Sequence, residues 1–337
     1  MSTQRRAKFV VIGGGTGSFS VLSALKPHVA DLTALVGMAD DGGSTGQLRD
    51  ELGVLPPGDV RQCLVALSDA PTQLRELFNY RFEDGALSGH SFGNLFLSAV
   101  EKMTHDFDEA VRVAAGVLRI NGRVLPITLD NVRLALTWPD KTTVRGEGRI
   151  DAMSFSAHEG RPNLHLEPKA TINPSADAAI RTADVIVIAP GDIYTSLGPL
   201  LVVGGVSQAL AATKAMVMYV CNLVVKPGQT SGFSVSDHAA EIERFAGGPI
   251  IDYVLYNTAQ PDPALLKKYS HEGELPVAIV RKALAGAHYQ TVGRRLLATD
   301  ASARQNTHDR LAAHRSFIRH EPAALARAIL QISAPRK

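Results

Sequence analysis

Two glycine-rich turns lie close together in the first fifty residues, and each directly follows a short apolar run. The first, Gly13-Gly14-Gly15-Thr16-Gly17, comes after residues 9–12, and the second, Asp40-Asp41-Gly42-Gly43-Ser44-Thr45-Gly46, comes after residues 32–38. Residues 18–25 have the pattern of a helix. In a strand–turn–helix unit of this kind, backbone N–H groups approach an anion closely and the helix N-terminus adds about half a positive charge. The two turns therefore predict a phosphate-binding cleft.

The turns match the known nucleotide-binding fingerprints only in part. Ser18 stands where the Gly-x-Gly-x-x-Gly motif has its third glycine, which argues against an NAD-dependent dehydrogenase. No Gly-Lys-Ser/Thr follows the first turn, so a P-loop is excluded as well. Asp40 and Asp41 offer the oxygen ligands that suit Mg²⁺ beside a phosphate; the alternative is that they only form the turn.

The balance of charge limits the classes of partner. The chain of 337 residues has 35 basic and 33 acidic side chains, and its formal net charge is +2. We therefore expect neither nucleic-acid binding nor membrane insertion, and the apolar runs are far shorter than the roughly 20 residues that span a bilayer. Cys63 and Cys221 form no zinc or disulfide pattern, which fits a cytoplasmic location. The oligomeric state stays open, with a homodimer as one option.

The order of apolar runs and helical patterns predicts the fold class. It favours a Rossmann-like, three-layer α/β/α fold with a mostly parallel sheet, built as a single domain over residues 1–337. Residues 122–172 change to short β-type runs separated by Pro, Asp and Gly, which predicts a β-rich insertion that includes a run at 124–128. Further strands are expected at residues 185–189, 215–221, 251–256 and 277–280, and a final helix is expected at 322–332.

Small polar residues follow two of the predicted central strands. Ligands of open parallel sheets bind beyond the carboxyl ends of the strands, so these residues are candidates for the site. Gly191, Tyr194, Thr195 and Ser196 come after the run at 185–189 and offer hydroxyl groups and a flexible glycine. Asn222 follows the run at 215–221, where its amide is placed to contact a sugar or a base.

Three candidates lie at predicted helix starts. Arg61 is the strongest candidate for a bidentate phosphate contact in the first half of the chain, so Arg61→Ala is expected to weaken nucleotide binding and to leave the fold intact. His90 and Asn94 are expected to point into the same cleft. Capping is the alternative for Arg61 and Asn94. For the pair Asp237-His238 we favour a structural or positioning role.

The loops as a set resemble one family, the YvcK-like gluconeogenesis factors, within the superfamily of 2-phospho-L-lactate transferases (CofD). The resemblance spans most of the chain. It rests on residues 13–17 and 40–46 and on Pro57-Gly58-Asp59-x-Arg61, His90-x-x-Gly93-Asn94-Leu95, Pro190-Gly191-x-x-Tyr194-Thr195-Ser196, Cys221-Asn222, Pro227-Gly228-x-Thr230 and Asp237-His238. Residues 192, 197–200 and 223–226 depart from the pattern of the YvcK-like branch, on what should be the sugar side.

The resemblance implies a ligand at the strand ends. In the YvcK-like branch it implies a regulator of cell shape that binds UDP-N-acetylglucosamine; in the transferase branch it implies Mg²⁺-dependent transfer of a phospholactyl group to a deazaflavin alcohol. Both involve nucleotide diphosphates, and turnover and sensing both stay open. The expected ligand-binding residues are Gly13, Gly14, Gly15, Thr16, Gly17, Asp40, Asp41, Gly42, Gly43, Ser44, Arg61, His90, Asn94, Gly191, Tyr194, Thr195, Ser196 and Asn222, with Asp40 and Asp41 also the candidate metal ligands.

Overall fold

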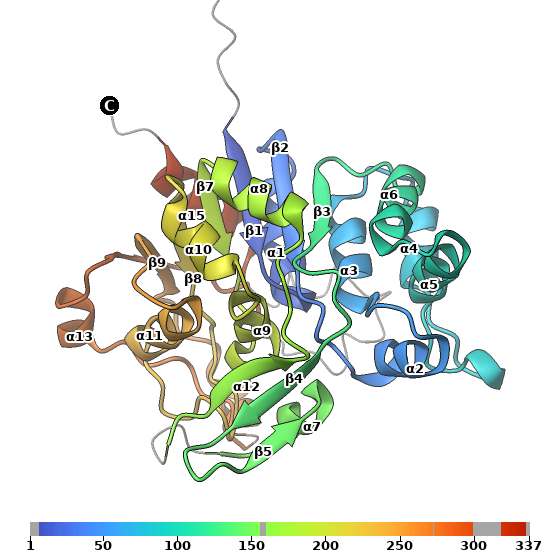
Figure 1. The fold of residues 1–337 in the computed structure, drawn as a ribbon. Coiled ribbons are helices and arrows are strands. Elements are labelled where there is room, and N and C mark those ends of the chain that lie inside the picture. Colours follow the sequence, from blue (N-terminus) through green and yellow to red (C-terminus); the bar gives the residue numbers. More distant parts are fainter. Residues whose placement is uncertain (1–6, 156–159, 272, 299–317, 335–337) are drawn as a thin grey trace, which may run out of the picture.

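A seven-stranded parallel sheet forms the centre of the molecule (Figure 1). The computed structural model describes residues 7–155, 160–271, 273–298 and 318–334. The strand order is β10-β9-β8-β7-β1-β2-β3, and every neighbouring pair is parallel. The strands are β1 (Lys8–Ile12), β2 (Asp31–Val36), β3 (Arg123–Pro126), β7 (Val185–Ile188), β8 (Met216–Val220), β9 (Tyr253–Asn257) and β10 (Gln290–Arg294). The central strands are almost continuous apolar runs because both faces of the sheet are covered.

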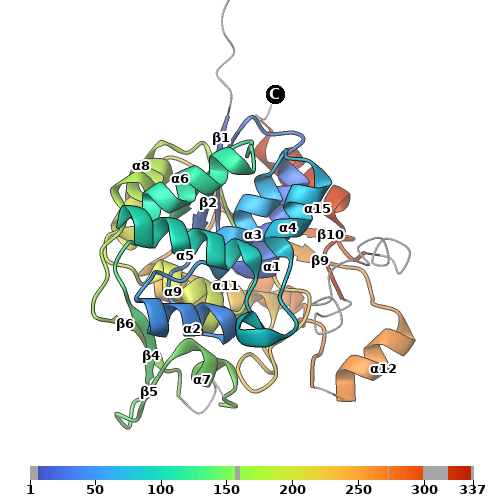
Figure 2. The ribbon, with the colours of Figure 1, turned by 90° about the vertical axis from the view of Figure 1, so that its right-hand side faces the viewer.

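Helices cover both faces of this sheet, which confirms the predicted three-layer α/β/α fold (Figures 1 and 2). Helices α1, α3 and α15 pack together on one face, and α8, α10 and α11 lie on the other. The helices are α1 (Gly15–Leu25), α2 (Gly43–Leu52), α3 (Gly58–Leu67), α4 (Thr72–Asn79), α5 (Phe92–Thr104), α6 (Phe107–Val117), α7 (Glu147–Asp151), α8 (Pro174–Thr182), α9 (Gly198–Leu201), α10 (Val206–Ala212), α11 (Val235–Ala246), α12 (Pro263–His271), α13 (Arg281–Ala285) and α15 (Pro322–Ser333), with a 3-10 turn η1 (Gly85–Leu87) and a π-helix η2 (Ile193–Leu197). Within the described ranges, no helix has both the length and the apolar character needed to cross a bilayer.

A small antiparallel sheet lies beyond the carboxyl edge of the main sheet. Its order is β5-β4-β6, from β4 (Arg133–Thr137), β5 (Thr143–Arg145) and β6 (Asn163–Glu167), with α7 between β5 and β6. The chain enters it from the carboxyl end of β3 and returns through α8 to β7, so it lies beside the loops that follow the central strands (Figure 1). The predicted β-rich segment therefore exists, but it begins later than expected.

Two expected strands are corrected by the sheet topology. The run at 124–128 was placed in the insertion, yet β3 pairs with β2 and completes one edge of the main sheet. Residues 277–280 form no strand; Ala278 makes only an isolated bridge to Ser234, and α13 begins at Arg281. The other edge strand is β10. Its residues show no alternation of apolar and polar side chains, so the sequence pattern does not predict it.

Local signals explain where several helices begin and end. Ser91 caps α5 and Asp106 caps α6, each by accepting a backbone N–H of the first turn. Ser234 and Asp237 form a capping box on α11, which gives Asp237 the structural role expected for it. Gly53 and Gly247 end α2 and α11 in the left-handed conformation, which glycine adopts without a side-chain penalty.

The strand order reverses between β1 and β7, and this is the point where ligands bind in open α/β sheets. The turn after β1 packs tightly there against the loop after β7. A Cβ atom on Gly17 would lie 1.7 Å from the carbonyl oxygen of Pro190. A Cβ on Gly13 would lie 2.5 Å from the hydroxyl of Ser18, the residue in place of the third glycine. Close packing at the switch point thus rests on Gly17.

We predict that Gly17→Ala destabilises the fold by about 2 kcal/mol or more, because the new methyl group meets a backbone carbonyl that has no rotamer to change. Gly116→Ala is the matched control, since a Cβ at this exposed position in α6 meets nothing within 4 Å. It should stabilise the fold by about 0.5–1 kcal/mol through helix propensity. Urea unfolding of both variants gives the comparison, and equal effects would contradict the packing argument.

Candidate functional site

The first glycine turn lies against a half-buried carboxylate. Asp59, near the start of α3, accepts a hydrogen bond from the backbone N–H of Gly15. A Cβ on Gly14 would lie 2.0 Å from Asp59 Oδ2, so only glycine lets this carboxylate reach the turn. Gly15 adopts a φ of +58°, which also favours glycine. In this structure, the anion at the N-terminus of α1 is therefore a side chain of the protein itself.

The second glycine turn brings Asp40 toward Asp59. Asp40 accepts hydrogen bonds from Gly42 N–H, at 2.9 Å, and from the side chain of Thr45. Burial, and after it the nearby charge of Asp40, raise the pKa of Asp59 to about 7. Burial also raises the pKa of Asp40. Two carboxylates in a poorly hydrated place favour a bound proton or a cation between them.

The candidate metal pair of the sequence, Asp40 and Asp41, has different surroundings in the structure. Asp41 Oδ1 accepts the N–H of Gly148 in α7 at 2.9 Å, and its Oδ2 lies 3.7 Å from Nη1 of Arg133 in β4. Asp41 therefore fastens the second glycine turn to the small sheet. Asp59 is a carboxylate on which the charge of Asp40 acts, and its sequence signal is the Pro-Gly-Asp motif at the start of a helix.

Glu147 is a site residue that the sequence did not reveal. It opens α7, and its carboxyl group faces the cluster; burial is the main cause that raises its pKa to about 8, followed by the charges of Asp40, Asp151, Asp41 and Asp59. Its carboxylate Oε2 is 3.6 Å from where a Cβ on Gly42 would lie. No motif marks it, because only the folding of residues 127–172 over the strand ends brings it to the cleft (Figure 2).

A chain of hydrogen bonds joins four of the expected site residues. His90 Nδ1 and Ser44 Oγ are 2.9 Å apart, Asn94 Nδ2 donates to Ser44 Oγ at 3.3 Å, and Arg61 Nε donates to Asn94 Oδ1 at 3.0 Å. The guanidinium of Arg61 also donates to Asn79. Arg61 is only 5% exposed, so it positions the start of α2 from beneath. Arg61→Ala is therefore expected to cost stability as well, contrary to the expectation from the sequence.

Arg49 in α2 is a second residue that the motifs did not single out. It is 4% exposed, donates from Nε and Nη2 to Asn131 Oδ1, and also donates to the carbonyl of Val132. Its Nη1 is buried without a hydrogen-bond partner among the described residues. Burial lowers its pKa, as does the charge of Arg133. Arg49 thus ties the helix of the second glycine turn to the lead-in of β4.

The loops after β7 and β8 lie at the same edge of the sheet as the glycine turns. Asn222 uses both ends of its amide on the backbone of Gly191: Oδ1 accepts its N–H at 3.1 Å, and Nδ2 donates to its carbonyl at 2.9 Å. Asn222 therefore holds the neighbouring loop in place. Lys226 Nζ donates to Asp151 in α7 at 2.6 Å and to Asp192 at 2.9 Å. The hydroxyl of Thr195 donates to the same Asp151 at 3.4 Å.

Tyr194 points into the protein interior, although its neighbours Thr195 and Ser196 belong to the same π-helix η2. The Tyr194 side chain is fully buried, and its hydroxyl donates to Glu241 Oε1 at 2.8 Å. Burial raises the pKa of Tyr194, and so does Glu241. π-Helices are rare and occur often at functional sites. Tyr194 thus fixes η2 to the buried Glu241 of α11, while the neighbouring Thr195 contacts Asp151 of α7.

The donor set limits how the site could hold a metal ion. Among the described residues, no group of three or more His, Cys, Asp or Glu side chains is arranged to hold one. Asp40 and Asp59 alone would fit Mg²⁺ only in the mode in which one or two carboxylates bind it together with substrate phosphates and water. A cation between these carboxylates would also relieve their mutual repulsion.

We predict that Glu147→Gln makes the chain more stable at about pH 8 and leaves its stability near pH 5 almost unchanged. Because the folded pKa of Glu147 is raised from 4.5 to about 8, the folded chain retains a proton that the unfolded chain loses. Stability is therefore full below about pH 4.5 and falls as the pH rises through about 8, by at most about 1.4 kcal/mol per pH unit for this group.

Thermal unfolding across this pH range, with EDTA present, measures the effect. The exposed Glu51, in α2, supplies the matched control Glu51→Gln, which should keep the slope of the native chain. An unchanged slope in Glu147→Gln would show that the carboxyl group is already ionised in the folded state.

Comparison with known proteins supports the assignment that the loops suggest. The sequence profile of the family described as 2-phospho-L-lactate transferase CofD matches residues 9–297. A protein from Nostoc sp., named "Putative gluconeogenesis factor", is 41% identical over 329 residues, which are 97% of this chain and 69% of that protein. A protein of the same name from Clostridium acetobutylicum is 43% identical over 263 residues, covering 78% of this chain and 58% of the relative.

A solved structure has the same fold. The crystal structure of a UPF0052-family protein from Bacillus halodurans superposes with a TM-score of 0.86 at 35% identity, and the match covers 97% of this chain and 99% of that one. The family profile, the named relatives and the superposition each match most of this chain. The chain belongs to the CofD family, and within that family it groups with the gluconeogenesis factors.

Proposed function

We propose that this chain binds UDP-N-acetylglucosamine at the carboxyl edge of its sheet and acts in the cytoplasm as a regulator of cell shape. The observation that carries the proposal is the meeting of the two glycine turns at Asp40 and Asp59, beside the switch point between β1 and β7. Asp59 and Asp40 occupy the N–H groups of Gly15 and Gly42, so a diphosphate would bind the other backbone N–H groups of the two turns. The relatives named gluconeogenesis factors support the regulator over the transferase.

The two half-buried carboxylates, Asp40 and Asp59, add a requirement to this proposal. A diphosphate placed beside Asp40 and Asp59 would meet two groups that already resist ionisation. Like charges at short distance in a poorly hydrated cleft are strongly unfavourable. We therefore expect a divalent cation, such as Mg²⁺, to enter with the ligand, held by Asp40 and Asp59 on one side and by phosphate oxygens on the other.

Each wall of the cleft has a part in this proposal. Ser44 and His90, at the start of α2 and before α5, contact each other beside the second glycine turn, and we assign them to the phosphate end of the ligand. Thr195 and Asp151 lie on the other wall, where sugar hydroxyl groups would find a donor and an acceptor. Helix α7 bridges the two walls through Gly148 and Asp151. The ligand would then lie beneath α7, in contact with Glu147.

Calorimetric titration tests the proposal with UDP-N-acetylglucosamine, UDP and GDP, each with Mg²⁺ and with EDTA. We expect the UDP-sugar to bind more tightly than UDP alone and to require Mg²⁺. A Mg²⁺-dependent preference for GDP would replace the regulator by the phospholactyl transferase, and the absence of any binding would overturn the nucleotide proposal.

We predict that Asp59→Asn lowers the affinity for the UDP-sugar in Mg²⁺ at least about tenfold, because one of two cation ligands is lost. The matched control is Asp106→Asn at the cap of α6, where asparagine caps as well as aspartate. This control should bind like the native chain. Equal affinities of both variants would remove Asp59 from the site.

A further inference from the structure

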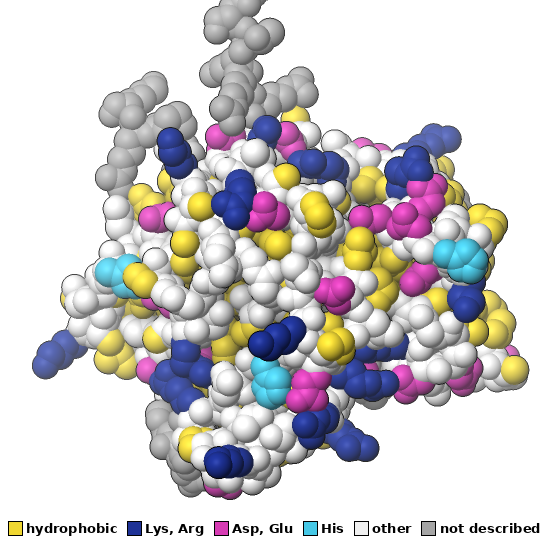
Figure 3. All heavy atoms as spheres, viewed as in Figure 1, with side chains coloured by type: hydrophobic (Ala, Val, Ile, Leu, Met, Phe, Trp, Pro, Cys, Tyr) yellow, Lys and Arg dark blue, Asp and Glu magenta, His cyan; other side chains and the backbone are white. Residues whose placement is uncertain are grey.

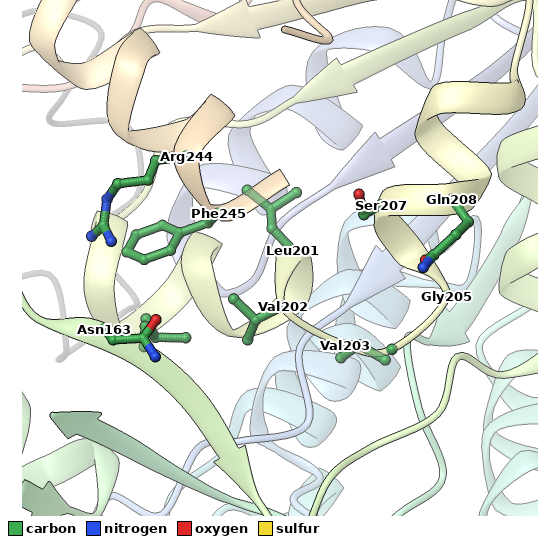
Figure 4. A pocket seen from close by; sticks show the side chains of 11 residues that line it. Asn163, Leu201, Val202, Val203, Gly205, Ser207, Gln208, Arg244 and Phe245 are labelled. Atoms are coloured by element: carbon green, nitrogen blue, oxygen red, sulfur yellow. The ribbon is translucent and has the colours of Figure 1, made fainter. Parts of the chain in front are cut away.

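A separate cavity, wide open to solvent at its mouth, lies between the small sheet and the helices that pack against η2. Its volume is about 370 Å³, which falls within the range of small-molecule sites. The walls come from the start of β6, the connection from α9 to α10 and the end of α11 (Figure 4). None of the loops that form the strand-end cleft contributes to it. The cavity is therefore a feature that the proposed function does not use.

The cavity has polar groups at two ends and an apolar middle. Figure 4 shows Arg244 and Asn163 on one side and Ser207 and Gln208 on the other. The ring of Phe245, with Leu201 and Val202, lies between them. An occupant with a polar group, an apolar body and a second polar group would match this order.

The charge around the cavity is unbalanced. Arg244 and Arg161 both form ion pairs with Glu241, whose side chain is fully buried. Two guanidinium groups thus share a single carboxylate, and about a third of each arginine side chain remains exposed. The Arg244 guanidinium lies 4.4 Å from the centre of the Phe245 ring, so it stands at the edge of the apolar surface. Figure 3 shows further Lys and Arg side chains over this lower part of the molecule.

We propose that this cavity is a second binding site, which takes a small organic anion: a monocarboxylate with a short apolar body. Its carboxylate would pair with Arg244 and accept from the amide of Asn163. Its carbon chain would lie on Phe245 and Val202 and would reach toward Ser207 and Gln208. A guanidinium in a partly buried position binds a carboxylate more strongly than an exposed one does.

The site is adjacent to the strand-end cleft through η2. The rings of Phe245 and Tyr194 pack edge to face, with centroids 5.8 Å apart, and Tyr194 donates to the same Glu241 that Arg244 contacts. A Cβ on Gly198, which directly follows η2, would lie 2.8 Å from Leu164 and 3.1 Å from Phe245, two residues that line the cavity. The lining residues Leu164 and Phe245 thus pack directly against η2 and the residue that follows it.

The test uses the full chain and two probes of nearly equal shape, hexanoate and hexanamide, at matched ionic strength. Ligand-observed NMR titration should show that hexanoate binds in the millimolar range or better and that hexanamide binds about tenfold more weakly, because only the carboxylate forms a charge-assisted contact. Equal binding of the two probes, or no binding of hexanoate, would overturn the proposal.

Two substitutions locate the binding without breaking the buried ion pairs. Gln208→Glu is isosteric, lies on an exposed side chain and adds a negative charge, so it should weaken hexanoate binding about fivefold. Val202→Phe should remove binding by filling the apolar middle. Gln73→Glu, on the exposed side of α4, is the matched control and should bind hexanoate like the native chain. Hexanoate affinity that survives both Gln208→Glu and Val202→Phe would place the anion elsewhere and overturn the proposal.

Discussion

The contact between Gly17 and the carbonyl of Pro190 sets the geometry on which both halves of the cleft rest. It joins the turn after β1 to the loop after β7 at the place where the strand order reverses. The backbones of these two loops lie so close together that no side chain fits between them. Moving the loops apart would therefore expose backbone groups that are now packed against each other. Gly14 and Asp59 repeat the same principle one step away, where an absent side chain makes room for a carboxylate.

Electrostatic repulsion is the second constraint, and it acts in the opposite direction. Asp40, Asp59 and Glu147 come from three separate elements, and each has a raised pKa because burial and like charges disfavour its ionised form. Packing forces these groups together, while their charges resist it. Packing that holds like charges together is common at functional sites, where the preorganised charges cost some of the stability of the fold. A cation and a diphosphate would convert this unfavourable cluster into a set of ligands.

The sequence predicted the fold class and most of the loops, since both follow from local patterns. Apolar runs followed by glycine turns identify the strands of a parallel sheet and the edge where its ligands lie. No local pattern predicts the roles of Glu147 and Arg49, because their positions result from tertiary contacts with the insertion. Tyr194 and Asn222 illustrate the reverse: each is a polar residue in a loop after a strand, as the sequence predicts, but its hydrogen bonds are made within the protein itself.

Residues 127–172 are at once a wall of the cleft and the covalent link between two groups of strands, β1 to β3 and β7 to β10. Changes in the length of such a link cost little, since the entropy of closing a loop grows only slowly with its length. A longer or shorter insertion would therefore change the span that α7 covers at the strand ends, while every buried strand stays as it is. The shape of this edge and the stability of the fold would then evolve on separate parts of one chain.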